Sequence, residues 1–77
     1  MNSLSAALAR ALVDYRHLSK LSQEELADAA GVHRTYVSQI ERGLKMPTLA
    51  VILKISKALG IRASDLVNKI ESECEEL

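Results

Sequence analysis

Apolar residues recur at spacings of three and four along most of the chain, which is the period of amphipathic α-helices. Capping and turn residues divide this pattern into five segments, and their expected bounds are about 2–18, 22–31, 33–43, 48–59 and 61–72. Connections between them are only a few residues long, and no repeat or low-complexity tract interrupts them. The pattern therefore predicts an all-α fold, a compact bundle of five helices.

The second and third segments form the most informative part of the chain, because both carry clear end signals. Ser22 and Glu25 make a capping box that begins a helix, and Gly31 can end it in the left-handed conformation. A second amphipathic run starts almost at once and continues to Gly43. Two helices joined this tightly must cross steeply, so residues 22–43 are predicted to form a helix-turn-helix.

The two faces of the third segment differ sharply in chemistry. Val37 and Ile40 form its inward ridge, Tyr36 lies at the margin, and Ala27 of the preceding segment allows close helix approach. The opposite face contains no aliphatic residue and consists of Arg34, Thr35, Ser38, Gln39 and Arg42. Guanidinium, amide and hydroxyl groups of this kind pair with base edges and phosphates in a DNA major groove.

Each residue on this face has an expected role. Arg34 is predicted to contact a guanine edge or a phosphate, Gln39 can pair with adenine, and Thr35 can offer its methyl group to thymine. Ser38 would permit close approach, and His33 is expected to be a cap or phosphate neighbour rather than a base reader. For each residue the alternative is a solvated surface side chain.

The spacing of Gln23, Ala27, Gly31, Val37 and Ile40, followed by the run IERG and a proline, resembles the phage-repressor-type (XRE, lambda-repressor-like) helix-turn-helix family. The likeness extends over roughly residues 5 to 70. Within that family, the run HRTYVSQIERG is also similar to controller proteins of restriction-modification systems.

The resemblance implies further roles. Gln23 would lie against the DNA backbone and brace the third helix, while Glu41 would form a structural ion pair with Arg16. Lys45 stands where controller proteins often have arginine, which weakens the narrower likeness. The full predicted DNA-binding set is Gln23, His33, Arg34, Thr35, Tyr36, Ser38, Gln39, Arg42 and Lys45.

The charge distribution supports an interface with nucleic acid even though the formal net charge is zero. Residues 1–70 contain ten basic and six acidic side chains, and the segment 71–77 contains the other four glutamates. The local field, rather than the total charge, attracts phosphate. The acidic tail is therefore expected to lie away from DNA.

Length and composition limit the remaining possibilities. A chain of 77 residues is expected to form a single domain (1–77), whose small core would benefit from a dimer partner. The single cysteine and the lack of a long apolar run predict a cytoplasmic protein without a membrane segment. No catalytic, cofactor or metal-ligand motif is present, so an enzyme is not expected.

Apolar residues of the last segment continue at helical spacing towards the end of the sequence. This stripe is a candidate dimer interface consisting of Leu66, Val67, Ile70, Cys74 and Leu77, and a frayed tail is the alternative. The sequence thus predicts a homodimeric transcription regulator that reads an imperfect palindrome of double-stranded DNA, as a repressor or a controller-type activator. An antitoxin-like or adaptor module with a protein partner is the competing hypothesis.

Overall fold

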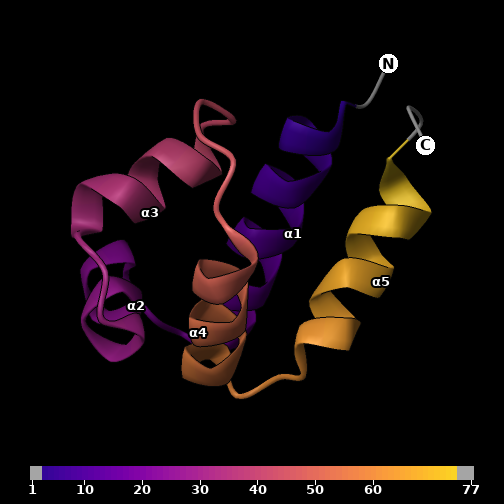
Figure 1. Ribbon diagram of the computed structural model, residues 1–77. Coiled ribbons are helices and arrows are strands. Elements are labelled where there is room, and N and C mark those ends of the chain that lie inside the picture. The colour runs from indigo at the N-terminus through magenta and orange to yellow at the C-terminus, as the bar shows by residue number, and fades with distance from the viewer. Residues whose placement is uncertain (1–2, 75–77) are drawn as a thin grey trace.

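The computed structural model describes residues 3–74 and contains five helices in this range (Figure 1). They are α1 (Leu4–Leu18), α2 (Gln23–Ala30), α3 (Arg34–Glu41), α4 (Leu49–Leu59) and α5 (Ala63–Glu73). No strand occurs within the described residues. The predicted five-helix, all-α fold is therefore confirmed.

The ends of the helices follow local chemistry. The hydroxyl of Ser3 accepts a hydrogen bond from the amide of Ala6 at 3.1 Å and begins α1. Thr48 performs the same function at α4, where its hydroxyl accepts from the amide of Val51 at 3.2 Å. Gly60 ends α4 with a φ of 74°, a conformation that residues with a Cβ avoid. Hydroxyl side chains at the start of a helix and glycine at its end are the residue types preferred at these positions.

The helices pack into two groups that meet at the centre of the molecule. In Figure 1, α1 and α5 lie side by side, α2 and α3 cross on the other side, and α4 lies between the groups. Helix α1 contacts both α3 and α5, while α4 contacts both α2 and α5. Every helix thus packs against at least two others, and α3 packs against α1 and α2.

The core is aliphatic, as expected for a chain without Phe or Trp. Its largest fully buried apolar side chains are Leu12, Leu26, Val37, Ile40, Ile55 and Leu66. Tyr15 and Tyr36 are half-buried at the edge of this cluster. One polar side chain, Ser56, is also buried in α4.

Several large apolar side chains lie outside the core. Val67 of α5 is 45% exposed, and Leu49 and Leu53 of α4 are 69% and 53% exposed. The cause is geometric: the apolar arc of each helix is wider than the strip that its neighbours cover, so residues at the edge of the arc remain in solvent.

None of the helices between residues 3 and 74 combines the length and the apolar character that crossing a lipid bilayer requires.

Candidate nucleic-acid interface

The turn between α2 and α3 fixes the angle at which the two helices meet. Gly31 adopts a φ of 71°, and the amide of Val32 donates to the carbonyl of Ala27 at 3.0 Å. At the start of α2, Ser22 and Glu25 form the predicted capping box, with hydrogen bonds of 3.0 and 2.9 Å. The turn is therefore defined by its own hydrogen bonds as well as by packing.

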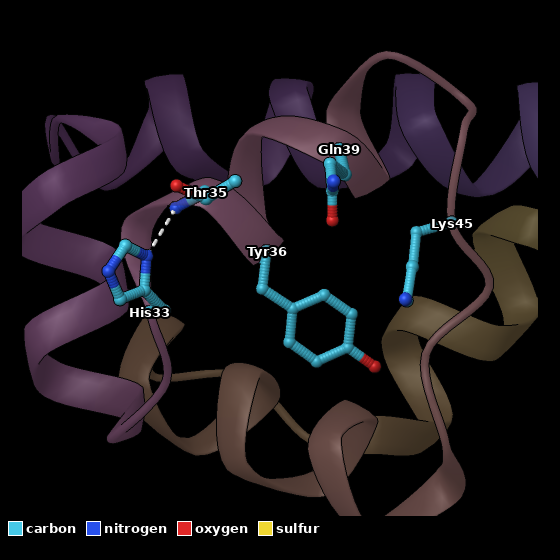
Figure 2. Close-up of a pocket in the computed structure, with 5 residues that line it drawn as sticks. All are labelled: His33, Thr35, Tyr36, Gln39 and Lys45. Atoms are coloured by element: carbon cyan, nitrogen blue, oxygen red, sulfur yellow. Dashed lines mark hydrogen bonds between the residues drawn. The ribbon is translucent and has the colours of Figure 1, made fainter.

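His33 provides the N-terminal cap of α3. Its Nδ1 accepts a hydrogen bond from the backbone amide of Thr35 at 3.1 Å, shown as the dashed line in Figure 2. Because Nδ1 acts as an acceptor, the neutral ring has its proton on Nε2, which is left as a donor. The cap role expected for His33 is thus present in the structure.

The remainder of α3 separates into a buried side and an accessible side. Val37 and Ile40 are fully buried beneath the helix, in the common core. The predicted recognition residues lie on the other side: His33, Arg34, Thr35 and Arg42 are exposed, and Tyr36, Ser38 and Gln39 are half-buried. The structure thus gathers these side chains on one outward-facing surface, which we call the α3 face.

A shallow hollow lies beside the α3 face. Its lining consists of His33, Thr35, Tyr36, Gln39 and Lys45. Figure 2 shows the Tyr36 ring in the middle, with His33 on one side and Lys45, from the loop after α3, on the other. The ammonium of Lys45 is 6.0 Å from the centre of the Tyr36 ring, at the outer limit of a cation–π contact. The fold therefore adds a residue from outside the helix to this surface.

An ion pair connects the base of this surface to α1. Arg16 donates from Nε to Glu41 Oε2 at 2.6 Å and from Nη2 to Glu41 Oε1 at 3.0 Å. A third guanidinium nitrogen, Nη1, donates to the carbonyl of Leu21 at 3.0 Å. The side chains of Arg16 and Glu41 are only 13% and 5% exposed. This is the pair that the resemblance implied, and its two-point geometry holds α3 against α1.

Gln23 extends the same network. Its side-chain amide donates to Glu41 Oε1 at 3.0 Å, so the first residue of α2 is tied to the last residue of α3. The hydrogen bonds from Arg16 to Glu41 raise the pKa of the Arg16 guanidinium, although burial opposes this shift. Glu41 therefore presents a compensated charge beside the α3 face, rather than a free carboxylate that would repel phosphate.

The residues of the candidate dimer stripe on α5 differ in how far they are buried. Leu66 is fully buried, and Ile70 and Cys74 are also classed with the core, so these side chains pack mainly within the domain. The expectation that Leu66 belongs to the dimer interface needs correction, because a side chain without exposed surface cannot contact a second subunit. Val67 is exposed, and Leu77 lies outside the described residues.

Sequence reasoning missed an apolar groove formed between α1, α4 and α5. It is lined by Leu4, Leu8, Met46, Leu49, Ile52, Val67, Ile70 and Glu71. Met46, Leu49 and Val67 are the large apolar residues that are most exposed there. One signal is visible in the sequence, because the apolar arc of α4 is wider than the strip of residues that faces the core. Which of these apolar residues remain exposed depends on where α5 packs.

No group of three or more His, Cys, Asp or Glu side chains within residues 3–74 is arranged to hold a metal ion. Cys74 is buried and lies far along the chain from both histidines.

A short helix with a buried underside, a polar outer face and a tight turn before it defines a DNA-binding regulator of the helix-turn-helix class. Comparison with known proteins agrees: the Helix-turn-helix family matches residues 12–66, and the chain belongs to this family.

Several relatives are named as control proteins. Control protein C.BamHI of Bacillus amyloliquefaciens is 52% identical over 50 residues, which cover 65% of this chain and 62% of that protein. Control protein C.SmaI of Serratia marcescens is 37% identical over 62 residues, covering 80% and 74% of the two chains. The match thus spans less than two thirds of the length of the first of these relatives.

Solved structures give the same result. The restriction-modification controller protein C.AhdI from Aeromonas hydrophila matches with a TM-score of 0.78 and 37% identity, over 80% of this chain and 94% of that one. The clp gene regulator ClgR from Corynebacterium glutamicum matches with a TM-score of 0.88 and 27% identity, over the full length of both chains. These similarities confirm the predicted family and its resemblance to controller proteins.

Proposed function

We propose that this protein is a homodimeric transcription regulator that inserts α3 into successive major grooves of an imperfect DNA palindrome. The observation that carries the proposal is the outward-facing α3 face, whose underside is buried and whose end is tied to α1 and α2 through Glu41. Base recognition needs side chains on a rigid helix, because a mobile helix would lose conformational entropy on binding and this loss would weaken its affinity for DNA.

The charge on and near α3 supports a nucleic-acid partner. Arg34, Arg42 and Lys45 are all exposed, whereas the acidic residue within α3, Glu41, is engaged by Arg16. Cations at this surface would meet phosphates and release counterions, which is the main sequence-independent term in DNA binding. The proposal needs no cofactor, metal or catalytic group, and the cytoplasmic location stays a prediction.

For the dimer, we assign the apolar groove to a second copy of the chain. Exposed Met46, Leu49 and Val67 project from three different elements around this groove, and Leu53 continues the ridge of Leu49 one turn further along α4. Contiguous exposed apolar side chains with a polar rim often mark contact surfaces. A two-fold contact would bury the same groove on both copies and add to a core that is small for a lone domain.

The dimensions of the domain agree with this arrangement. It measures 31 × 23 × 22 Å, and the groove lies on α1, α4 and α5, whereas the α3 face belongs to the other helix group (Figure 1). The groove and the hollow beside α3 share no lining residue, so a contact at the groove can leave both α3 faces uncovered, and the longest dimension of one domain is close to the spacing that the two α3 helices must match. One turn of DNA separates successive major grooves by about 34 Å.

DNA recognition is tested by selection of random duplexes with the purified protein. We expect enrichment of an inverted repeat whose half-sites are about 34 Å apart, one helical turn. An unenriched pool, with equal binding to all duplexes at every salt concentration, would contradict sequence-specific recognition.

The dimer surface is tested with Leu49→Glu, which places a charge in the groove. Leu18→Glu is the control, because Leu18 is 77% exposed on α1 and does not line the groove. In sedimentation equilibrium, Leu49→Glu should be monomeric and Leu18→Glu should dimerise like the unsubstituted protein. If Leu49→Glu leaves the association constant unchanged, the groove is not the dimer surface, and the adaptor hypothesis with a different protein partner gains support.

A further inference from the structure

The exposed side of α4 changes in character along the helix. Exposed residues recur there at helical spacing, namely Leu49, Ala50, Leu53, Lys54 and Lys57. The first three are apolar, and the two lysines follow towards the C-terminal end. Neither lysine forms an ion pair with another residue in the range 3–74. This side of α4 therefore joins an apolar half to a basic half whose charge is not compensated within the domain.

An acidic side chain lies near the other end of α4. Glu71 is the charged residue in the lining of the apolar groove, together with Met46 from the preceding loop and Leu49 from the first turn of α4. In Figure 1, α4 and α5 run in opposite directions, so the last part of α5 returns towards the start of α4. Glu71 is exposed and has no ion pair within the described part of the chain. One copy thus presents, in order along α4, a carboxylate, an apolar stretch and two ammonium groups.

This order is complementary to itself when two copies meet about a two-fold axis. In an antiparallel pair of α4 helices, the C-terminal half of each lies opposite the N-terminal half of the other. With the axis midway between Leu49 and Leu53, Lys54 lies opposite Thr48 of the other copy, at the end of the helix that Glu71 flanks. A parallel pair would instead place lysines beside lysines, and like charges in contact disfavour association.

Building on the proposed dimer, we infer that the two α4 helices pack antiparallel across the two-fold axis and that Lys54 of each copy forms an ion pair with Glu71 of the other. A second copy fits the groove because it supplies both the apolar stretch and the opposite charge at matching positions. The two symmetric pairs lie at an exposed rim and add little affinity. Their effect is to fix the register of the contact and to disfavour partners with a different charge order.

Charge reversal tests the pair, because symmetry makes each single variant incompatible with itself and compatible with the other. A Lys54→Glu homodimer would bring carboxylates together at both sites, and a Glu71→Lys homodimer would bring ammonium groups together. The dimer dissociation constant of each variant should rise roughly tenfold, since two pairs change from attraction to repulsion. In an equimolar mixture, every pair is again of opposite sign. Sedimentation equilibrium should therefore show dimers in the mixture at a concentration at which each variant alone is monomeric.

The double variant Lys54→Glu with Glu71→Lys exchanges the two charges within one chain. Both pairs are then restored with reversed direction, so its dissociation constant should lie within about threefold of that of the unsubstituted protein. Both side chains are exposed, so the single and double variants should keep the helical circular dichroism spectrum. A double variant that dimerises no better than the single variants would contradict the pairing.

A second pair of variants controls for the change in net charge. Lys57→Glu lies one turn further along α4, and Glu24→Lys lies on α2, which does not line the groove. Both residues are exposed, and the two variants have the same net charges as the first pair. Each should dimerise within about threefold of the unsubstituted protein, and mixing them should produce no gain.

The outcomes separate this inference from the proposed dimer surface. If Leu49→Glu abolishes dimers but the mixture of Lys54→Glu and Glu71→Lys shows no gain, the groove remains the dimer surface and the ion pair is wrong. An equal gain in the control mixture would also overturn the inference, because net charge rather than a defined pair would explain it. If the unsubstituted protein is monomeric, or if Leu49→Glu leaves its dimerisation unchanged, the dimer surface and the ion pair both fail.

Discussion

The guanidinium of Arg16 and the carboxylate of Glu41 form a two-point hydrogen-bonded pair, with donor–acceptor distances of 2.6 and 3.0 Å. The two residues are 25 positions apart in the sequence and join the C-terminal parts of α1 and α3. Because Glu41 also accepts from Gln23, one carboxylate connects three helices. The orientation of the DNA-facing helix thus depends on a contact away from the α3 face.

Breaking this pair should destabilise the fold strongly. Glu41→Leu leaves the Arg16 guanidinium largely buried without its partner, and we expect a loss of about 3 kcal/mol or more in the free energy of unfolding. The double variant Arg16→Met with Glu41→Leu should lose much less, because no uncompensated charge remains. Urea unfolding of the single and double variants measures the coupling. Additive losses would mean that the pair does not act as a unit.

Arg34→Ala should weaken operator binding by about 1–3 kcal/mol and relax the preference at one base pair, as expected when a base contact is removed. Arg34 is exposed in the first turn of α3, where side chains enter the groove. Binding titrations with the cognate operator and with single-position variants provide the measurement. Equal weakening of cognate and random duplexes would count against base recognition by Arg34.

Lys45→Ala should behave differently. Its ammonium lies in the loop after α3 and is expected to contact the DNA backbone, so affinity for all duplexes should fall alike. The slope of the logarithm of affinity against the logarithm of salt concentration should decrease by about 1. A loss confined to one operator position would assign Lys45 to base recognition.

Ser56→Ala should stabilise the protein. The Ser56 side chain is buried, and its hydroxyl has no hydrogen-bond partner among the described residues. Removing an unsatisfied buried hydroxyl from a helix should raise the free energy of unfolding by about 1 kcal/mol. Ser72→Ala, on the exposed part of α5, is the control and should change it by less than about 0.5 kcal/mol. A destabilised Ser56→Ala would indicate that a water molecule satisfies this hydroxyl.

Gly31→Ala should cost about 1–2 kcal/mol, because Gly31 has a φ of 71° in the turn of the helix-turn-helix. A Cβ at this position would meet no heavy atom within 4 Å, so the cost is conformational rather than steric. Gly31→Asn should therefore cost less, since asparagine tolerates the left-handed region better than alanine. Thermal unfolding compares the two variants, and equal losses would contradict a conformational origin.

Most of the fold could be predicted from local signals. The capping box at Ser22 and the left-handed glycine at position 31 act within a few residues, so their effect can be read without knowledge of the partners. The α3 face was also predictable, because helical periodicity determines which side chains share a side. Its inner boundary at Val37 and Ile40 agrees with the structure.

Other features depended on how the helices pack. The exposure of Leu49 and Val67 could not be predicted, since an apolar residue is buried only where a neighbouring helix covers it. Gln23 was expected to brace the third helix only through the family resemblance, and its hydrogen bond to Glu41 depends on the crossing of α2 and α3. The hollow, likewise, exists because the loop after α3 brings Lys45 beside Tyr36.

The sequence by itself determined the helices, their ends and the polar side of α3, because these follow from interactions within one or two turns. Only the tertiary structure decided which apolar residues remained in solvent and how α3 is supported. Those outcomes depend on contacts between residues far apart in the chain, such as Arg16 and Glu41, and local periodicity contains no information about the relative placement of two helices.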